Sequence, residues 1–364
     1  MDNTKYYVTA ENARGFVTAV LKGNGVGEED ASTVARCLIE ADLRGVDTHG
    51  KSMIACWGGV LDPKAKPILK EITPVVCQVD GQNSFGFVSA TLAMDKCIEM
   101  AKVYGIGMAS IKHSNHFGMS ASFVLQAARQ DMMSLVFTNS SPALPVWGGK
   151  SKLMGVSPIA AGAPGGPGGI PFVLDMAPSV AARGKVYRAL RRGEKIPLDW
   201  ALDGEGNQTD DPARALEGVM LPMGGPKGSA LAIFMDVFSG VLSGSAFAGE
   251  VVGPYDPSRE SNVGHFIMAI KPDLFMPFSD FKERMSYLYN KVINSDKMGG
   301  VDRIYFPGEL EILQQEVSVI GACGSHYLMG YQAREKSGIP WTQEEIDALN
   351  AEADLVGAPH LVVS

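Results

Sequence analysis

The residues with the most evident chemistry stand together in Arg44-Gly45-Val46-Asp47-Thr48-His49-Gly50. A cation is followed by a carboxylate, a hydroxyl and an imidazole between two glycines, directly after an amphipathic segment at 30–43. His49 stands out because the unperturbed pKa of histidine lies nearest neutrality, so its ring can give or take a proton at working pH. The alternative is a plain helix end, with Gly45 as its left-handed stop and His49 capping carbonyl groups.

A second histidine, His116, is predicted at a switch from strand to helix. It follows a predicted strand at 108–112 and precedes a predicted helix at about 120–129. Polar side chains at such a switch tend to face a ligand, although a structural histidine is the alternative. His113 stands three residues earlier, but no neighbouring Asp, Glu or Cys completes a ligand set, so we expect no zinc site.

Three further segments are candidates for binding. The stretch at 224–229 places Lys227 and small residues at the start of a long apolar helix, where free amides and the helix dipole attract an anion. The alternative there is a simple turn with a solvated lysine. Asp175 lies among apolar residues and needs a partner, which is either a bound ribose or nicotinamide or the start of a helix at Ser179. The polar stretch at 138–142 ends a strand and is either a ligand edge or an ordinary turn.

The composition indicates a large globular protein. The chain has 364 residues, of which 46% are hydrophobic and 20% charged, so it can bury a sizeable core. Its net charge of −8 and the lack of a basic block disfavour a nucleic-acid partner. The longest apolar run, at 229–248, contains Asp236 and is interpreted as a buried helix, so we expect no membrane span. Five scattered cysteines without a CxxC pair, and no visible export signal, favour a cytoplasmic location.

Hydrophobic periodicity predicts alternating helices and strands. The predicted helices are at 9–21, 30–43, 90–104, 120–129, 179–192 and 279–293, and the strands at 75–79, 108–112, 134–138, 172–176 and 266–270. The order of elements over 108–138 indicates a βαβ unit. The glycines at 23–27 follow no strand and are predicted as a helix–helix turn, and those at 162–169 as a loop. Thr342 to Glu345 is predicted to cap a C-terminal helix.

Six segments together resemble the type-2 malate/L-lactate dehydrogenase family. This family includes ureidoglycolate and sulfolactate dehydrogenases, diketogulonate reductase and piperideine-2-carboxylate reductases. The segments occur in the family's order and cover nearly the whole chain: residues 44–50, 114–118, 155–160, 174–177, 225–228 and 305–309.

The resemblance implies an α/β (mixed α+β) fold with a non-Rossmann nicotinamide-binding domain. This domain has a large mixed, mainly antiparallel sheet, and a helical domain is formed from both termini. We expect residues 116–269 to bind the cofactor, and residues 1–115 with 270–364 to form a helical region for substrate binding and dimerisation. A homodimer with a small-molecule substrate is implied, with no nucleic-acid or membrane partner.

The same resemblance implies an NAD(P)-dependent oxidoreductase that transfers hydride between nicotinamide and a 2-hydroxy/2-oxo acid. His49 is then the proton donor and acceptor, while His116 and Thr48 assist or orient the substrate. Substrate contacts are expected from Arg44, Lys51, Met53 and Ser140. Contacts to the cofactor, NAD or NADP, are expected from Asp175, Met176, Ala177, Ser179, Lys227, Gly228, Pro307, Gly308 and Glu309.

One departure from the family pattern bears on the substrate. The family places an arginine, which pairs with the substrate carboxylate, four residues after the histidine, where this chain has Met53. Either Lys51 or another cation replaces it, or the substrate differs from a simple 2-hydroxy acid. The alternatives are a cyclic imine (piperideine/pyrroline-2-carboxylate) reductase and a nucleotide-binding protein without turnover. A hydrolase is disfavoured because no GxSxG nucleophile elbow is present.

Overall fold

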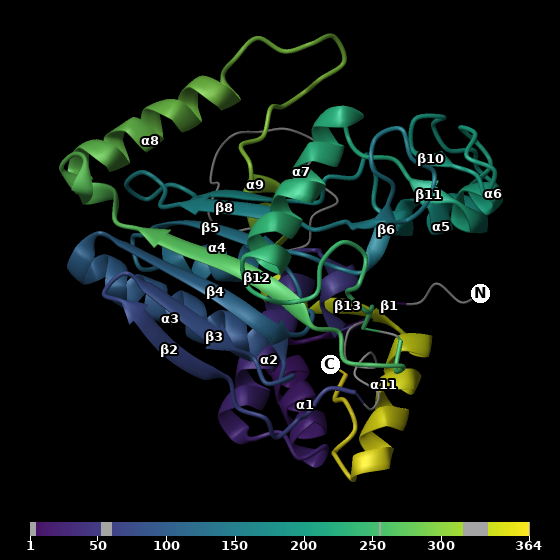
Figure 1. Cartoon of the computed structure of the whole chain (residues 1–364), viewed down its shortest axis with the longest axis horizontal. Helices are drawn as coiled ribbons and strands as arrows, with labels where there is room; N and C mark the ends of the chain where they lie inside the picture. Colours follow the sequence, from purple (N-terminus) through teal and green to yellow (C-terminus); the bar gives the residue numbers. More distant parts are fainter. Residues whose placement is uncertain (1–4, 52–59, 255, 316–333, 364) are drawn as a thin grey trace.

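The computed structural model describes residues 5–51, 60–254, 256–315 and 334–363. Its centre is a seven-stranded sheet in the order β2-β3-β4-β12-β5-β8-β9 (Figure 1). The strands are β2 (Ile68–Thr73), β3 (Val76–Asp80), β4 (Ile106–Ser114), β5 (Met133–Thr138), β8 (Ile159–Ala163), β9 (Phe172–Met176) and β12 (Val263–Ile270). Only the β3–β4 pair is parallel, which confirms the expected mixed, mainly antiparallel sheet.

The predicted βαβ unit over 108–138 needs a correction. β4 and β5 are joined by α4 (Ala121–Ala128), but β12 lies between them and pairs antiparallel with both. A strand from much later in the chain therefore separates the two. The adjacent parallel pair is β3 and β4, connected by α3 (Gly86–Tyr104).

Both faces of the sheet are covered by helices. Alternate residues of β12 point to opposite faces, and Ile267 and Ala269 belong to the fully buried core under α3 and α4. Phe266 points the other way and stacks with Phe137 at a ring-centroid distance of 5.8 Å. On that second face lies α7 (Pro226–Asp236), which continues as a π-helical turn, η3 (Val237–Val241).

The two ends of the chain form one helical unit with its own core. β1 (Lys5–Val8) pairs with β13 (Ile339–Thr342), and α1 (Ala10–Gly23), α2 (Glu28–Leu43) and α11 (Gln343–Val356) gather around them (Figure 1). Trp341 is fully buried at the centre. The predicted capping box is confirmed, because Thr342 and Glu345 exchange side-chain and backbone hydrogen bonds. The expected helical unit from both termini is therefore present.

A third, smaller core lies beyond β9. It is formed by short elements: β6 (Pro142–Leu144), β7 (Met154–Gly155), α5 (Arg183–Arg192), β10 (Ala201–Leu202), α6 (Pro212–Glu217) and β11 (Val219–Met220). The prediction that a helix begins at Ser179 is wrong: α5 has Ala182 as its N-cap, and Ser179 instead makes a β-bridge with Pro222. The remaining elements are η4 (Pro272–Leu274), α8 (Phe278–Ile293), α9 (Glu309–Gln315) and α10 (Arg334–Ser337).

No helix in the described ranges is long and apolar enough to span a membrane. Of the five cysteines, Cys37, Cys77 and Cys97 are free and buried, and Cys56 and Cys323 lie outside the described residues.

Candidate active site

The turn that carries His49 begins where α2 ends. Gly45 has a φ of 78° and its amide donates to the Asp42 carbonyl, so it is the left-handed helix stop that the sequence allowed. The following residues form a short 3₁₀ turn, η1 (Asp47–His49). The His49 ring does not cap carbonyl groups: its Nδ1 lies 2.9 Å from Thr48 Oγ1, and the ring has no main-chain partner among the described residues. Only the His49 amide bonds to the main chain, at the Val46 carbonyl.

Asp42 ties this turn back onto α2. Its Oδ2 accepts a hydrogen bond of 2.8 Å from the Lys51 amide. Its Oδ1 lies so close to Gly50 that a Cβ there would come within 2.0 Å of it. The end of the turn therefore needs a glycine at position 50. Burial also raises the pKa of the Asp42 carboxyl to about 7.

Arg334 secures the other side of the turn. Its guanidinium donates to both carboxylate oxygens of Asp47 and to the carbonyl of Asp42. Arg334 is 8% exposed, whereas the Asp47 side chain is 46% exposed, so the ion pair is buried only on the arginine side. Because Arg334 belongs to α10, the far end of the chain fixes a turn near its beginning.

His116 lies in the loop between β4 and α4. The Gly118 amide donates to His116 Nδ1 at 3.0 Å, so the neutral ring carries its proton on Nε2. The preceding Asn115 is anchored by its side-chain amide, which donates to Asn83 Oδ1 and to the Ser84 carbonyl. The ring is thus oriented by its own loop.

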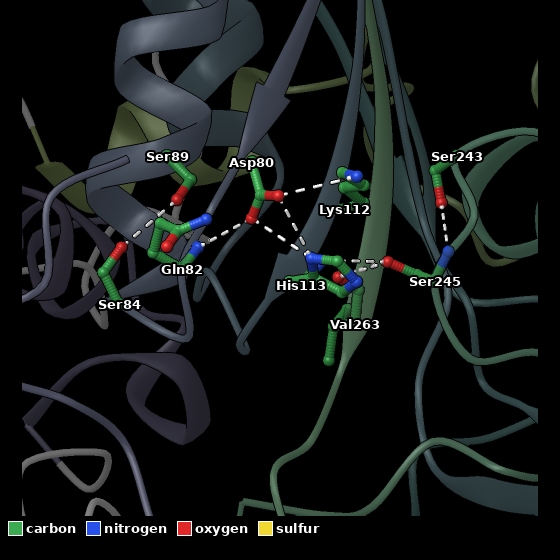
Figure 2. A network of polar contacts seen from close by, with 9 residues as sticks. All are labelled: Asp80, Gln82, Ser84, Ser89, Lys112, His113, Ser243, Ser245 and Val263. Carbon is green, nitrogen blue, oxygen red and sulfur yellow. Dashed lines mark hydrogen bonds and ion pairs between the residues drawn. The ribbon is translucent and has the colours of Figure 1, made fainter. Parts of the chain in front are cut away.

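The backbone leading into this loop is unusual. Gln82, Asn83 and His113 all have φ between 49° and 58°, which non-glycine residues rarely adopt. The His113 ring contacts Asp80, whose carboxylate also faces Lys112, and the His113 amide donates to Ser245 Oγ (Figure 2). Such conformations cluster where surrounding contacts enforce a functional geometry. No group of three or more His, Cys, Asp or Glu side chains in the described residues could hold a metal ion.

The two histidines meet although they come from different elements. The rings of His49 and His116 are stacked, with centroids 5.6 Å apart and planes at 28°. Burial lowers the pKa of His49 below its usual 6.5. Burial, followed by the nearby His49 and His265, lowers the pKa of His116 to about 3. Both rings are therefore neutral at pH 7, and a neutral imidazole can accept a proton from, or donate a hydrogen bond to, a bound molecule.

A third histidine, His265 in β12, was missed by the sequence reasoning. It is fully buried and stacks on Phe117 with centroids 4.5 Å apart. Its Nδ1 lies 2.7 Å from Thr138 Oγ1 and its Nε2 lies 3.0 Å from Ser114 Oγ. It thus connects the ends of β4 and β5, from which the His116 and Ser140 loops depart. A lone histidine in an apolar strand gives no sign in the sequence that it connects two other strands. The connection depends on β12 lying between β4 and β5.

This network predicts an acid-sensitive stability. Burial lowers the pKa of His265 to about 3 from 6.5. The contribution of the neutral His265 ring to the free energy of unfolding is therefore complete above pH 6.5 and is lost as the pH falls toward 3. Between pH 7.5 and 5 we expect His265 to account for a loss on the order of 2 kcal/mol in the free energy of unfolding. Urea unfolding of wild type and His265→Gln at both pH values measures this, and the variant should lose less stability. His360→Gln, at an exposed histidine, is the control; equal losses in wild type and His265→Gln would contradict the prediction.

The residues expected to bind substrate have varied surroundings. Lys51 is 4% exposed, with Nζ 3.6 Å from Glu345 Oε1 and above the Trp341 ring. Arg44 is 4% exposed and donates to Gln315, while its Nε and Nη2 have no partner within the described part of the chain. Ser140 Oγ is buried and likewise has no hydrogen-bond partner among the described residues. Thr48 is exposed beside His49, and Met53 lies outside the described residues.

The segments expected to bind the cofactor lie side by side. The Met223 amide donates to the Pro178 carbonyl, and Gly228 is packed so closely on the same carbonyl that a Cβ would come within 2.7 Å. This brings the end of β9 at Met176, with Ala177 and Ser179 after it, against the start of α7, where Lys227 is exposed. On the other side of β9, the Val173 amide donates to the Pro307 carbonyl, and Gly308 packs against Val173.

Two acidic residues of these segments already have protein partners. Asp175 Oδ2 accepts a 2.7 Å hydrogen bond from the Ala121 amide, so it caps α4 and not a helix at Ser179. Loss of hydration among the surrounding protein atoms raises the pKa of the Asp175 carboxyl to about 6, although part of the residue is exposed. Glu309 is fully buried and accepts from Arg303, Tyr289 and the Phe306 amide. Its carboxylate therefore holds together the turn that contains Pro307 and Gly308.

Comparison with known proteins gives matches along almost the whole chain. The family profile described as malate/L-lactate dehydrogenase matches residues 8–350. Malate dehydrogenase from Pyrococcus abyssi is 37% identical over 363 residues, which cover 96% of this chain and 94% of that protein.

Two further relatives are named with their cofactors. Ureidoglycolate dehydrogenase (NAD(+)) from Escherichia coli O157:H7 is 32% identical and covers 82% of this chain and 86% of its own length. (2R)-3-sulfolactate dehydrogenase (NADP(+)) from Chromohalobacter salexigens is also 32% identical, with 79% of this chain and 87% of that protein covered.

Solved structures share the fold. Sulfolactate dehydrogenase from Methanocaldococcus jannaschii has a TM-score of 0.85 at 33% identity, with 97% of this chain and 98% of that chain covered. Delta1-piperideine-2-carboxylate reductase from Pseudomonas syringae has a TM-score of 0.80 at 26% identity, with 95% and 99% covered.

Proposed function

This chain belongs to the malate/L-lactate dehydrogenase family and is an oxidoreductase with hydroxy-acid dehydrogenase activity that uses NAD or NADP, and we propose that His49 is its acid–base group. The substrate we propose is a 2-hydroxy/2-oxo acid. The observation that carries this assignment is the stacked pair of neutral imidazoles from the α2 and β4 ends. In hydroxy-acid oxidation, neutral His49 takes the hydroxyl proton, and in the reverse direction its protonated form returns it.

His116 has a different proposed role. Its Nδ1 is occupied by the Gly118 amide, so the neutral ring carries its hydrogen-bond donor at Nε2. With a pKa of about 3 it stays neutral throughout the working range. A permanently neutral donor can hold the substrate oxygen while His49 exchanges the proton. Thr48, 2.9 Å from His49 Nδ1, orients the His49 ring.

The described residues fit a nicotinamide cofactor. The N-terminus of α7 offers the positive end of the dipole of an 11-residue helix and the exposed ammonium of Lys227, which suit a phosphate. The free amides expected from the sequence are not present there, because the amides of Lys227 and Gly228 donate to the Gly224 and Met223 carbonyls. The backbone of 176–179 continues from the end of β9 and that of 307–308 adjoins the strand at Val173, and Gly228 and Gly308 allow these close approaches. The cofactor, when bound, supplies the hydride transfer. We propose that residues 116–269 carry most of this cofactor surface, and that the two terminal segments form the unit that carries His49.

A substrate screen tests the function. We expect oxidation of NADH or NADPH, followed at the absorbance of the reduced nicotinamide, with at least one of oxaloacetate, pyruvate and sulfopyruvate. Cofactor binding without turnover of any 2-oxo acid or cyclic imine would favour a nucleotide-binding protein. Turnover of piperideine-2-carboxylate alone would favour the imine reductase, the alternative raised by Met53 and by the structural similarity to such a reductase.

We further propose a homodimer formed through the outer face of α7 and η3. Large apolar side chains spaced along this face are 42–58% exposed: Ile233, Val237, Val241 and Leu242. Monomeric proteins rarely expose such a continuous apolar stripe. In addition, no residue of α8 is buried, so this helix also leaves surface available for a subunit contact.

The dimer predicts the effect of a charge on this stripe. Replacing Val237 with Asp should convert the protein to a monomer, because a carboxylate buried in an apolar contact has no partner. Size-exclusion chromatography with light scattering measures the mass. Val103→Asp, at a valine that is 70% exposed near the end of α3 and outside the stripe, should leave the mass of wild type unchanged. A wild-type protein of 38.7 kDa in solution would refute the dimer.

A further inference from the structure

A cavity of about 450 Å³ lies between α1, α2 and the end of α4, apart from the two stacked histidines. Its polar lining comes from three arginines, two hydroxyl residues, one carboxylate and one amide: Arg14, Arg36, Arg129, Thr18, Ser32, Glu40 and Gln315. Pockets of this volume suit small-molecule ligands. Neither His49, His116 nor any residue of the expected cofactor segments lines it.

The charges of the cavity do not balance. Arg129 pairs with Glu40 Oε1. Arg36 donates to the Thr91 hydroxyl, a neutral partner. For Arg14 no hydrogen bond or ion pair is present among the described residues. Two guanidinium groups therefore face this space without a carboxylate partner in the described part of the chain.

Buried polar atoms at its wall also lack partners. Glu40 is 5% exposed, yet its Oε2 has no hydrogen-bond partner among the described residues. Beside it, Arg44 leaves Nε and Nη2 unpaired within the same ranges and donates only to Gln315, which lines the cavity. Buried polar groups are normally hydrogen-bonded, so unpaired ones of both signs point to a missing partner.

We propose that this cavity binds a small polyanion that also carries a hydroxyl or another hydrogen-bond donor. The arginines pair with its anionic groups, because a guanidinium matches carboxylate and phosphate oxygens with two parallel hydrogen bonds. The donor group satisfies Glu40. Hydroxylated polycarboxylates and phosphorylated metabolites share this chemistry. The occupant contacts Gln315, the partner of Arg44, so it lies beside the start of the His49 turn.

Isothermal titration calorimetry of the full chain, at constant ionic strength and without cofactor, tests the site with two probes, citrate and pyrophosphate. We expect saturable binding of one molecule per chain by at least one probe. Binding of citrate alone identifies a polycarboxylate site, and binding of pyrophosphate alone identifies a phosphate site. Absence of saturable binding by both probes overturns the proposal.

Matched variants locate the binding. The double variant R14Q/R36Q should weaken it at least about tenfold, since two charge-assisted contacts are lost. The variant R191Q/R192Q removes the same charge from exposed positions on α5, in a different part of the molecule (Figure 1), and should bind as wild type does. Ser32→Asp adds a carboxylate at an exposed position of the lining, so it weakens binding even if the double variant fails to fold. Wild-type affinity in R14Q/R36Q or in Ser32→Asp, or equal weakening in R191Q/R192Q, contradicts the assignment.

Discussion

Replacing His49 with alanine should lower kcat by about a thousandfold, because general acid–base catalysis contributes between about a hundredfold and ten-thousandfold. The affinity for reduced nicotinamide should change by less than about twofold, since none of the proposed cofactor contacts comes from the turn at 44–50. His116 cannot replace the lost group, because its pKa of about 3 makes the neutral ring too weak a base to take up the hydroxyl proton near neutrality. Steady-state kinetics and fluorescence titration with NADH and NADPH measure the two effects.

His113→Asn is the matched control for this variant. His113 lies near the end of β4, three residues before His116, and its ring contacts Asp80 (Figure 2). Asparagine also tolerates the φ of 49° at this position. We expect His113→Asn to keep kcat within about fivefold of wild type. If His49→Ala retains more than about a tenth of wild-type kcat, His49 is not the acid–base group.

Replacing Gly50 with alanine should nearly abolish activity without touching a reacting group. The new Cβ would lie 2.0 Å from Asp42 Oδ1 and 2.3 Å from its Cγ, and Asp42 is fully buried, so the turn must move. Its displacement breaks the hydrogen bond from the Lys51 amide to Asp42 and shifts His49 relative to His116. Misplacement by about 1 Å costs roughly a hundredfold in rate, and overpacking costs about 1–3 kcal/mol in stability.

Kinetics and thermal unfolding of Gly50→Ala measure these effects. Gly15→Ala is the control, because a Cβ at Gly15 meets nothing within 4 Å, and it should leave activity unchanged and Tm equal or slightly higher.

If the clash with Asp42 is the cause, the losses of stability in Gly50→Ala and Asp42→Ala should not be additive. Asp42→Ala removes the clash, so the double variant Asp42→Ala/Gly50→Ala should be about as stable as Asp42→Ala alone. Additive losses would show that the Gly50–Asp42 contact is not the cause.

Local features of the sequence predicted local structure well. The first two helices, the glycine turn between them, the stop at Gly45 and the capping box at Thr342 depend on residues close together in the chain, and all are present. The start of α5 was misplaced, because Ser179 is a good cap by residue type but pairs with Pro222 from another segment.

Long-range pairing set the limits of the site prediction. The sequence singled out His49 and His116, but their stacking depends on α2 and β4 meeting in the fold. His265 and Arg334 were missed because the first acts through β12, inserted between β4 and β5, and the second through Asp47 near the opposite end of the chain. Lys51 was proposed as a substitute cation from its position in the sequence, whereas its contacts are with Glu345 and Trp341 of the terminal unit; its role in substrate binding stays a prediction.

The most direct test of His49 is the pH dependence of kcat/KM for hydroxy-acid oxidation in wild type and His49→Ala. Burial lowers the pKa of His49 below 6.5, and oxidation needs the neutral ring. The rate of wild type should therefore rise with pH through a pKa below 6.5 and level off above it. The residual rate of His49→Ala should lack this rise, and a rise that persists with the same pKa in His49→Ala would contradict the assignment.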